Sequence, residues 1–121
     1  MRRIFVFGSN KAGRHGKGAA LFALKKHGAM YGLGWAMQGD SYAIPTKGHN
    51  LEVLPLKEIE RYVKGFIRFA ESPHGKTLAF DVTAIGCGLA GYKPEEIAPM
   101  FKGSPDNVHL PQEFKIILNK G

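Results

Sequence analysis

Short apolar runs alternate along this chain with segments whose hydrophobic residues recur at helical spacing. The apolar runs predict strands at residues 4–7, 41–46, 78–85 and 107–110. The segments between them predict helices at about 18–27, 55–70 and 94–101, while residues 112–118 fit either a helix or a strand. This alternation predicts an α/β fold, a three-layer α/β/α sandwich around a mixed central sheet. We expect residues 1–121 to form a single domain.

The helix predicted at residues 55–70 has the clearest pattern. Its apolar side chains share one face and comprise Leu56, Ile59, Val63, Phe66, Ile67 and Ala70. Charged residues at spacings of four occupy the opposite face, which is typical of a solvent-exposed surface. By contrast, residues 30–40 are rich in glycine and are expected to be irregular. Pro45 indicates that the end of the 41–46 strand is unpaired or lies at an edge.

Two glycine-rich loops each follow a predicted strand and precede a predicted helix. The first is GSNKAGRHGKG at residues 8–18, and the second is GCGLAG at residues 86–91, after which Pro94 opens a helix. Because glycine has no Cβ, the backbone amides of such loops can approach an anion closely. Ligands of α/β sheets bind outside the carboxyl ends of the strands, so we expect the two loops to lie side by side there and to bind phosphate groups.

Neither loop completes the nucleotide-binding motif that it partly matches. GCGLAG has the spacing G-x-G-x-x-G of dinucleotide-binding folds, but Asp106, at the distance of the ribose-binding carboxylate, precedes a strand instead of ending one. In the first loop, Arg14 and His15 stand where a triphosphate-binding loop needs lysine and a hydroxyl residue. The sequence therefore argues against ATP or GTP hydrolysis and leaves a nicotinamide-dependent redox enzyme as a minor alternative. Tight turns that bind nothing are the remaining interpretation of the loops.

The composition is that of a folded protein with a basic surface. Of 121 residues, 44% are hydrophobic and 22% are charged, and the net charge of +7 either favours an anionic partner such as nucleic acid or serves solubility alone. The apolar runs are too short for a membrane span or a secretory signal, so we expect no membrane partner. A single cysteine cannot form an internal disulfide, which fits a cytoplasmic location.

The two glycine loops and the strand end at Lys47 together resemble the macrodomain family, the small α/β/α modules that bind ADP-ribose. The segments that carry the resemblance are FGSN with its following glycines, GKGAALFALKKHG, YAIPTK and IGCGLAGY, within roughly residues 4–110. The closest similarity is to the branch that contains terminal ADP-ribose protein glycohydrolase, and small phage and prophage macro-like proteins look similar along most of the chain. The resemblance implies a macrodomain-like sandwich and, if the chain is phage-encoded, the cytoplasm of a bacterial host.

The resemblance also implies roles for individual residues. Lys47 stands where that branch keeps a catalytic lysine that attacks the distal ribose, and Asn10 is expected to position this ribose. The partner carboxylate falls at Ala90, which can neither accept nor donate a proton, so the second half of that mechanism is missing. The implied ligand-binding residues are Gly8, Ser9, Asn10, Gly16, Lys17, Gly18, Thr46, Gly86, Cys87, Gly88, Leu89, Ala90, Gly91 and Tyr92. Without the resemblance, Lys47 is equally well a solvated lysine and Asn10 a brace of its own loop.

Two further side chains have a chemical and a structural interpretation. Asp81, in the strand before the second loop, either forms a structural ion pair or contributes a carboxylate to the site, and strand alternation places it on the face of Thr83 and Ile85. Cys87 lies between two glycines, where helix-end amides would lower its pKa, although no histidine base can be assigned to it.

Cations and aromatic residues supply the remaining candidates. Arg14 and Lys17 are placed to assist phosphate binding at the mouth of the first loop. Tyr92, Phe22 or Trp35 would stack on adenine unless they belong to the core.

The ligand that the sequence favours is therefore ADP-ribose or a related NAD-derived nucleotide, free or carried on a protein or nucleic acid. Hydrolysis of an ADP-ribosyl linkage is the activity that would accompany it. The alternative is a non-catalytic nucleic-acid-binding module whose basic surface and glycine loops contact backbone phosphates. The sequence requires no cofactor, and its five histidines show no paired metal-ligand spacing.

Overall fold

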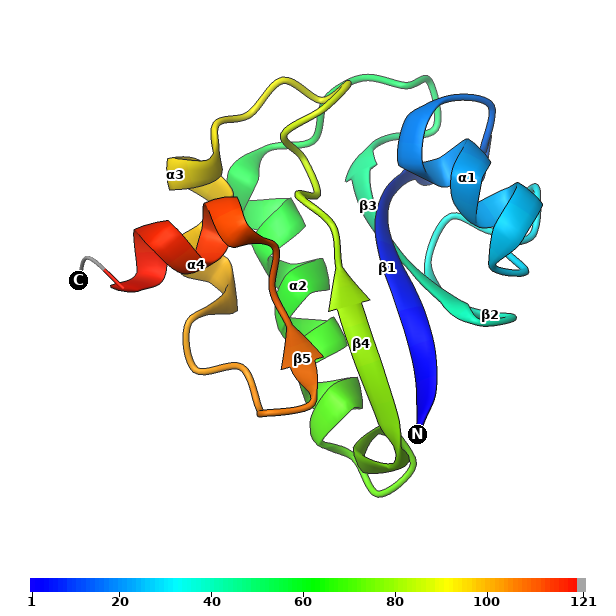
Figure 1. The fold of residues 1–121 in the computed structure, drawn as a ribbon. Coiled ribbons are helices and arrows are strands. Elements are labelled where there is room, and N and C mark those ends of the chain that lie inside the picture. Colours follow the sequence, from blue (N-terminus) through cyan, green and yellow to red (C-terminus); the bar gives the residue numbers. More distant parts are fainter. Residues whose placement is uncertain (120–121) are drawn as a thin grey trace.

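A computed structural model describes residues 1–119 as a mixed α/β fold built on one five-stranded sheet (Figure 1). The strands are β1 (Arg2–Asn10), β2 (Ala36–Gln38), β3 (Ser41–Lys47), β4 (Leu78–Val82) and β5 (Val108–His109). The α-helices are α1 (Gly18–Lys26), α2 (Leu56–Glu71), α3 (Pro94–Ile97) and α4 (Gln112–Asn119), and the 3₁₀ helices are η1 (Gly75–Thr77) and η2 (Ala98–Phe101). No helix within residues 1–119 is long and apolar enough to cross a membrane.

The sheet has the order β2-β3-β1-β4-β5 and places β1 at its centre. The pairs β1–β3, β1–β4 and β4–β5 are parallel, whereas β2 pairs with β3 in the antiparallel sense, so the sheet is mixed. Because β1, β3 and β4 run in one direction, the loops that follow them emerge at the same end of the sheet, at the top of Figure 1.

Alternation along β1 divides the core into two clusters on opposite faces of the sheet. Ile4 and Val6 pack with the apolar face of α2, and Phe5 and Phe7 pack with the alanines of α1. The larger cluster also contains buried residues of η2, α4, β4 and β5. Helices therefore cover both faces of the sheet, and within residues 1–119 the face that carries α1 has one helix.

The predicted order of elements is confirmed, while several boundaries and one strand differ. The helical face predicted for α2 is the one that is buried. β1 continues through Asn10, so three residues assigned to the first glycine loop belong to the strand. β4 ends at Val82, and the segment after it is already irregular. The last segment is a helix, α4, and the helix predicted at 94–101 becomes 3₁₀ at Ala98.

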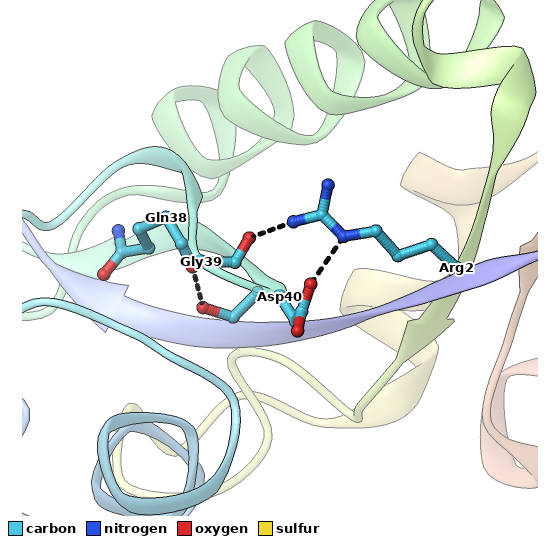
Figure 2. A network of polar contacts seen from close by, with 5 residues as sticks. Arg2, Gln38, Gly39 and Asp40 are labelled. Carbon is cyan, nitrogen blue, oxygen red and sulfur yellow. Dashed lines mark hydrogen bonds and ion pairs between the residues drawn. The ribbon is translucent and has the colours of Figure 1, made fainter.

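The strand β2, which the sequence did not predict, lies beside β3 at one edge of the sheet. It is joined to β3 by a turn at Gly39 and Asp40 that Arg2 of β1 holds in place, as Figure 2 shows. The Arg2 guanidinium pairs with the Asp40 carboxylate and donates a hydrogen bond of 2.9 Å to the Gly39 carbonyl. The Ser41 hydroxyl donates to the Gln38 carbonyl across the same turn, at 2.7 Å. The turn therefore fixes β2 and the irregular segment before it.

Pro45 lies in an interior strand, at a point where one neighbour has stopped. β2 pairs with only the first three residues of β3, so the side of Pro45 that faces β2 lacks a strand partner. On the other side Pro45 pairs with Ser9, and the register then shifts so that Asn10 lies opposite Lys47 and Thr46 is skipped. The proline is tolerated because no neighbouring strand needs the N–H that it lacks.

Candidate functional site

A cavity of about 700 Å³ lies at the carboxyl ends of β1, β3 and β4. Most of the residues that the sequence singled out for ligand binding line it. They are Gly8, Ser9, Asn10, Gly16, Lys17, Gly18, Thr46, Lys47, Gly86, Gly88, Leu89 and Ala90. The structure thus brings together three segments that are separated by more than twenty-five residues in the sequence.

The two glycine loops lie side by side at the base of the cavity. A Cβ at Gly8 would lie 3.5 Å from the backbone nitrogen of Gly86. Gly86 itself has a φ of +74°, and a Cβ there would approach the Ile97 side chain to 3.1 Å. Glycine at residue 86 therefore lets the second loop turn away from the sheet while its backbone stays close to β1.

Asn10 braces the first loop with its side-chain amide. Its carbonyl oxygen accepts from the backbone N–H of Arg14 at 2.9 Å, and its NH₂ group donates to the Arg14 carbonyl at 3.0 Å. The side chain also lines the cavity, and only 8% of the residue is exposed. Because an amide NH₂ carries two hydrogens, one donor is left for a ligand in addition to the bracing role.

Lys47 and Thr46 both line the cavity although they are consecutive residues of one strand. The register shift at this point makes that possible, because an extra residue in one strand re-aims a side chain. The Thr46 hydroxyl donates to the Ser9 carbonyl at 3.3 Å. Lys47 is half-buried, and within the described part of the chain its ammonium forms no ion pair.

The charge that faces the cavity is of one sign. Arg14, Lys17 and Lys47 line it, and within residues 1–119 no aspartate or glutamate does. Backbone N–H groups of the glycine loops add partial positive charge. The cavity is therefore electrostatically suited to an anion, and it lacks a carboxylate that could transfer a proton.

Asp81 is a structural residue and not part of the cavity. Its carboxylate forms two hydrogen bonds with the Arg3 guanidinium, one of them 2.9 Å from Nε to Oδ2, on an exposed part of the sheet. Thr83 and Ile85 line the cavity, whereas Asp81 does not. The alternation expected from 78–85 does not continue to Ile85, because β4 ends at Val82 and the Ile85 N–H donates to the Thr83 carbonyl across a tight turn, at 2.7 Å.

Three of the predicted ligand-binding residues, Cys87, Gly91 and Tyr92, are not brought to the cavity. The Tyr92 hydroxyl donates to the Leu54 carbonyl at 2.6 Å, and the ring packs against the core. Burial against the same cluster raises the pKa of the Cys87 thiol to about 11, with Glu113 adding a smaller contribution. The predicted lowering of this pKa is therefore wrong, because desolvation outweighs any stabilisation by nearby amides.

The cavity also has lining residues that the sequence did not reveal. Tyr31 and Leu51 belong to segments outside the glycine loops, and both are exposed at the surface. Together with Leu89 they add exposed large apolar side chains to the lining. Tyr31 and Leu51 belong to no motif, so only the fold brings them to the cavity.

Tyr31 belongs to a segment, residues 30–35, that is fixed against the end of β1. The Gly32 N–H donates to the Gly13 carbonyl at 2.8 Å, and the Met30 N–H donates to Gln38 Oε1 at 2.8 Å. Gln38 Nε2 donates to the Leu33 carbonyl at 2.9 Å. We call residues 30–35 the aromatic loop, because it carries Tyr31 and Trp35, both of which are exposed.

His15 lies beneath the aromatic loop and is fully buried. Its Nε2 lies 2.9 Å from the Leu33 carbonyl and 3.2 Å from Gln38 Oε1. Both neighbours are acceptors, so the ring carries its proton on Nε2. The ring also packs edge-on against Phe7, which ties the aromatic loop to the smaller core cluster.

Within the described residues, no group of three histidine, cysteine, aspartate or glutamate side chains is arranged to hold a metal ion. Comparisons of the chain with protein-family models, with curated proteins and with solved structures found no match.

Proposed function

We propose that the cavity binds ADP-ribose or a related NAD-derived nucleotide. The observation that carries the proposal is the lining itself, in which two adjacent glycine loops and three cations face a space without a carboxylate. A diphosphate needs backbone N–H groups that it can approach closely and positive charge around them. The glycine loops supply the first, and Arg14, Lys17 and Lys47 supply the second.

The size and rim of the cavity support a ligand larger than phosphate. About 700 Å³ lies within the range of pockets that hold small organic ligands and cofactors. Tyr31, Leu51 and Leu89 offer apolar contacts to a nucleobase, and the free N–H of Asn10 is available to a ribose hydroxyl. The macrodomain-like, three-layer arrangement of the fold is part of the same proposal.

Hydrolysis of an ADP-ribosyl linkage is a second candidate, which the position of Lys47 favours. Its ammonium lines the cavity and has no ion-pair partner within residues 1–119, so it is available as a nucleophile or as an electrostatic stabiliser. Ala90, to which the resemblance assigns the position of the hydrolases' acid, is among the residues that line the cavity. Any hydrolysis must therefore proceed without a carboxylate from this lining, and binding is the function that we favour.

Titration calorimetry tests the binding proposal with ADP-ribose, NAD, AMP and a short oligonucleotide. We expect saturable binding of ADP-ribose that persists at moderate salt. Removing both cations of the first loop, in Arg14→Gln with Lys17→Gln, should weaken binding about 5- to 30-fold, because each of these exposed side chains contributes about 0.5–1 kcal/mol to an ion pair. Lys76→Gln, at an exposed residue of η1, is the matched control and should bind as the wild type does. Oligonucleotide binding without any heat from ADP-ribose would overturn the proposal.

A release assay tests the second candidate separately. Wild type and Lys47→Ala are incubated with ADP-ribosylated protein and ADP-ribosylated DNA, and free ADP-ribose is measured. Release by the wild type and none by Lys47→Ala, with calorimetric binding retained, would support hydrolysis. No release by the wild type from any substrate would leave the chain as a binding protein.

A further inference from the structure

A second hollow, of about 270 Å³, lies beside the outer surface of α2. It is lined by Trp35 of the aromatic loop and by Glu58, Arg61, Tyr62, Gly65 and Arg68 of α2, and we call these six residues the α2 groove. None of them lines the cavity described above. The α2 groove is therefore a separate feature that the proposed function does not use.

Two aromatic rings form one side of the α2 groove. Trp35 is 55% exposed, and its ring lies 6.1 Å from that of Tyr62 at an angle of 60°. An exposed indole on a flexible loop would have no defined position and would not indicate a binding surface. Here, however, the preceding residue is fixed, because the Ser9 hydroxyl donates to the Gly34 carbonyl and Gly34 packs directly on the backbone of Asn10. The protein thus holds an exposed tryptophan face in a defined position.

The charge of the α2 groove is positive. Its one carboxylate, Glu58, is paired with the ammonium of Lys11. Arg61 and Arg68 form no ion pair with any residue of the described chain. Two guanidinium groups are thus left for an external anion, next to aromatic rings that offer a stacking surface.

We propose that the α2 groove binds single-stranded nucleic acid, with a base stacked on Trp35 beside Tyr62 and backbone phosphates paired with Arg61 and Arg68. Aromatic platforms flanked by cations are the common means of binding unpaired strands, because every base presents a flat face. An acidic peptide would use the arginines but would gain nothing from the exposed indole. In a duplex the base faces are already stacked on one another and are not available to Trp35.

The α2 groove lies close to the cavity through shared backbone. Asn10 lines the cavity, whereas the next residue, Lys11, pairs with Glu58 of the groove. The aromatic loop likewise places Tyr31 at the cavity and Trp35 at the groove. A strand bound in the groove would therefore pass near the cavity, but its binding does not depend on which ligand the cavity accepts.

Trp35 is the only tryptophan of the chain, so its fluorescence reports on the α2 groove directly. We expect an oligothymidylate to quench this emission, and an abasic oligomer of equal length to bind more weakly and to quench little. The affinity should fall with salt at a slope of about −0.7 for each phosphate contacted. Equal binding of the abasic oligomer, or equal quenching by a polyglutamate peptide, would overturn the proposal.

Variants of the α2 groove test the same proposal, with the affinity for a labelled oligothymidylate measured by fluorescence anisotropy. Trp35→Ala should weaken binding about 5- to 100-fold, because stacking contributes about 1–3 kcal/mol for each base, and Trp35→Phe should restore part of it. Arg61→Ala with Arg68→Ala should reduce the salt slope, whereas Lys76→Ala, which removes one exposed charge elsewhere, should leave the slope nearly unchanged. Oligonucleotide binding that is the same in all variants would refute the site.

ADP-ribose calorimetry on these variants separates this proposal from the proposed function. Retained ADP-ribose binding with lost oligonucleotide binding in Trp35→Ala supports the α2 groove. If Trp35→Ala loses both kinds of binding, the arginine variants decide, since the Arg61 and Arg68 side chains are exposed and neither residue lines the cavity. If the arginine variants lose oligonucleotide binding and retain ADP-ribose binding, the result supports the α2 groove. If their oligonucleotide binding is unchanged, the result excludes it.

Discussion

The packing of Gly34 against the end of β1 predicts that Gly34→Ala destabilises the protein through the aromatic loop. A Cβ at Gly34 would lie 1.9 Å from the Asn10 carbonyl oxygen, far inside the 3.0 Å that real Cβ contacts respect. The obstacle is backbone in the central strand of the sheet, which cannot move aside. The aromatic loop must therefore shift by at least about 1 Å.

The size of the effect follows from the hydrogen bonds that such a shift breaks. The Ser9 hydroxyl donates to Gly34, and both Gln38 and His15 contact the Leu33 carbonyl at 2.9 Å. At about 1 kcal/mol for each bond, Gly34→Ala should lower the free energy of unfolding by about 3 kcal/mol. For a domain of this size that corresponds to a fall in Tm of about 10 °C.

Urea denaturation followed by circular dichroism measures the free energy of unfolding, and the emission of Trp35 reports the position of the aromatic loop. Gly16→Ala is the matched control, because a Cβ there meets nothing within 4 Å and the φ of Gly16 is not positive. Its stability should stay within about 1 kcal/mol of the wild type. A Gly34→Ala protein as stable as Gly16→Ala would show that the loop does not pack on Asn10, and the argument for a fixed Trp35 would fail with it.

Two further predictions concern side chains that the cavity leaves out. The Cys87 thiol, with its pKa raised from 9.0 to about 11 by burial, should carry about 100-fold less thiolate at neutral pH than an ordinary cysteine. Its alkylation should therefore be slow and should keep accelerating up to about pH 11, and a plateau near pH 8 would contradict the buried environment. Asp81→Asn should cost less than about 1 kcal/mol in urea denaturation, because the pair with Arg3 is exposed, and should leave ADP-ribose affinity unchanged. A selective loss of ADP-ribose binding or release in Asp81→Asn would instead give this carboxylate a part in the site.

The parts of the fold that local rules determine were predictable from the sequence. The periodicity of α2 identifies its buried face, and the parallel direction of β1, β3 and β4 brings the two glycine loops to one edge of the sheet. Both features depend on spacing that is visible in the sequence. The adjacency of Gly8 and Gly86 follows from the same topology.

The features that tertiary packing determines were not predictable. β2 has only three residues between glycine-containing turns, too few to show an alternation. Cys87 has the neighbours of an exposed loop residue, yet it packs on the core, and that burial reverses the expected change of its pKa. Tyr31 and Leu51 reach the cavity from distant segments without any motif. Trp35 was expected to stack on adenine or to lie in the core, and it lies in the α2 groove instead.

Thr46 of β3 has no pairing partner in β1. The number of residues at the end of β3 therefore matters as much as their identity. Asn10 pairs with Lys47 only because β3 holds one residue more than β1 requires between Pro45 and that pair. A chain with one residue fewer here would restore regular pairing, and this strand end would then present one side chain to the cavity where it now presents two consecutive ones. When sequences of this kind are aligned, a gap between Pro45 and Lys47 would therefore mark a protein whose strand end lines the cavity differently, even where every other residue is retained.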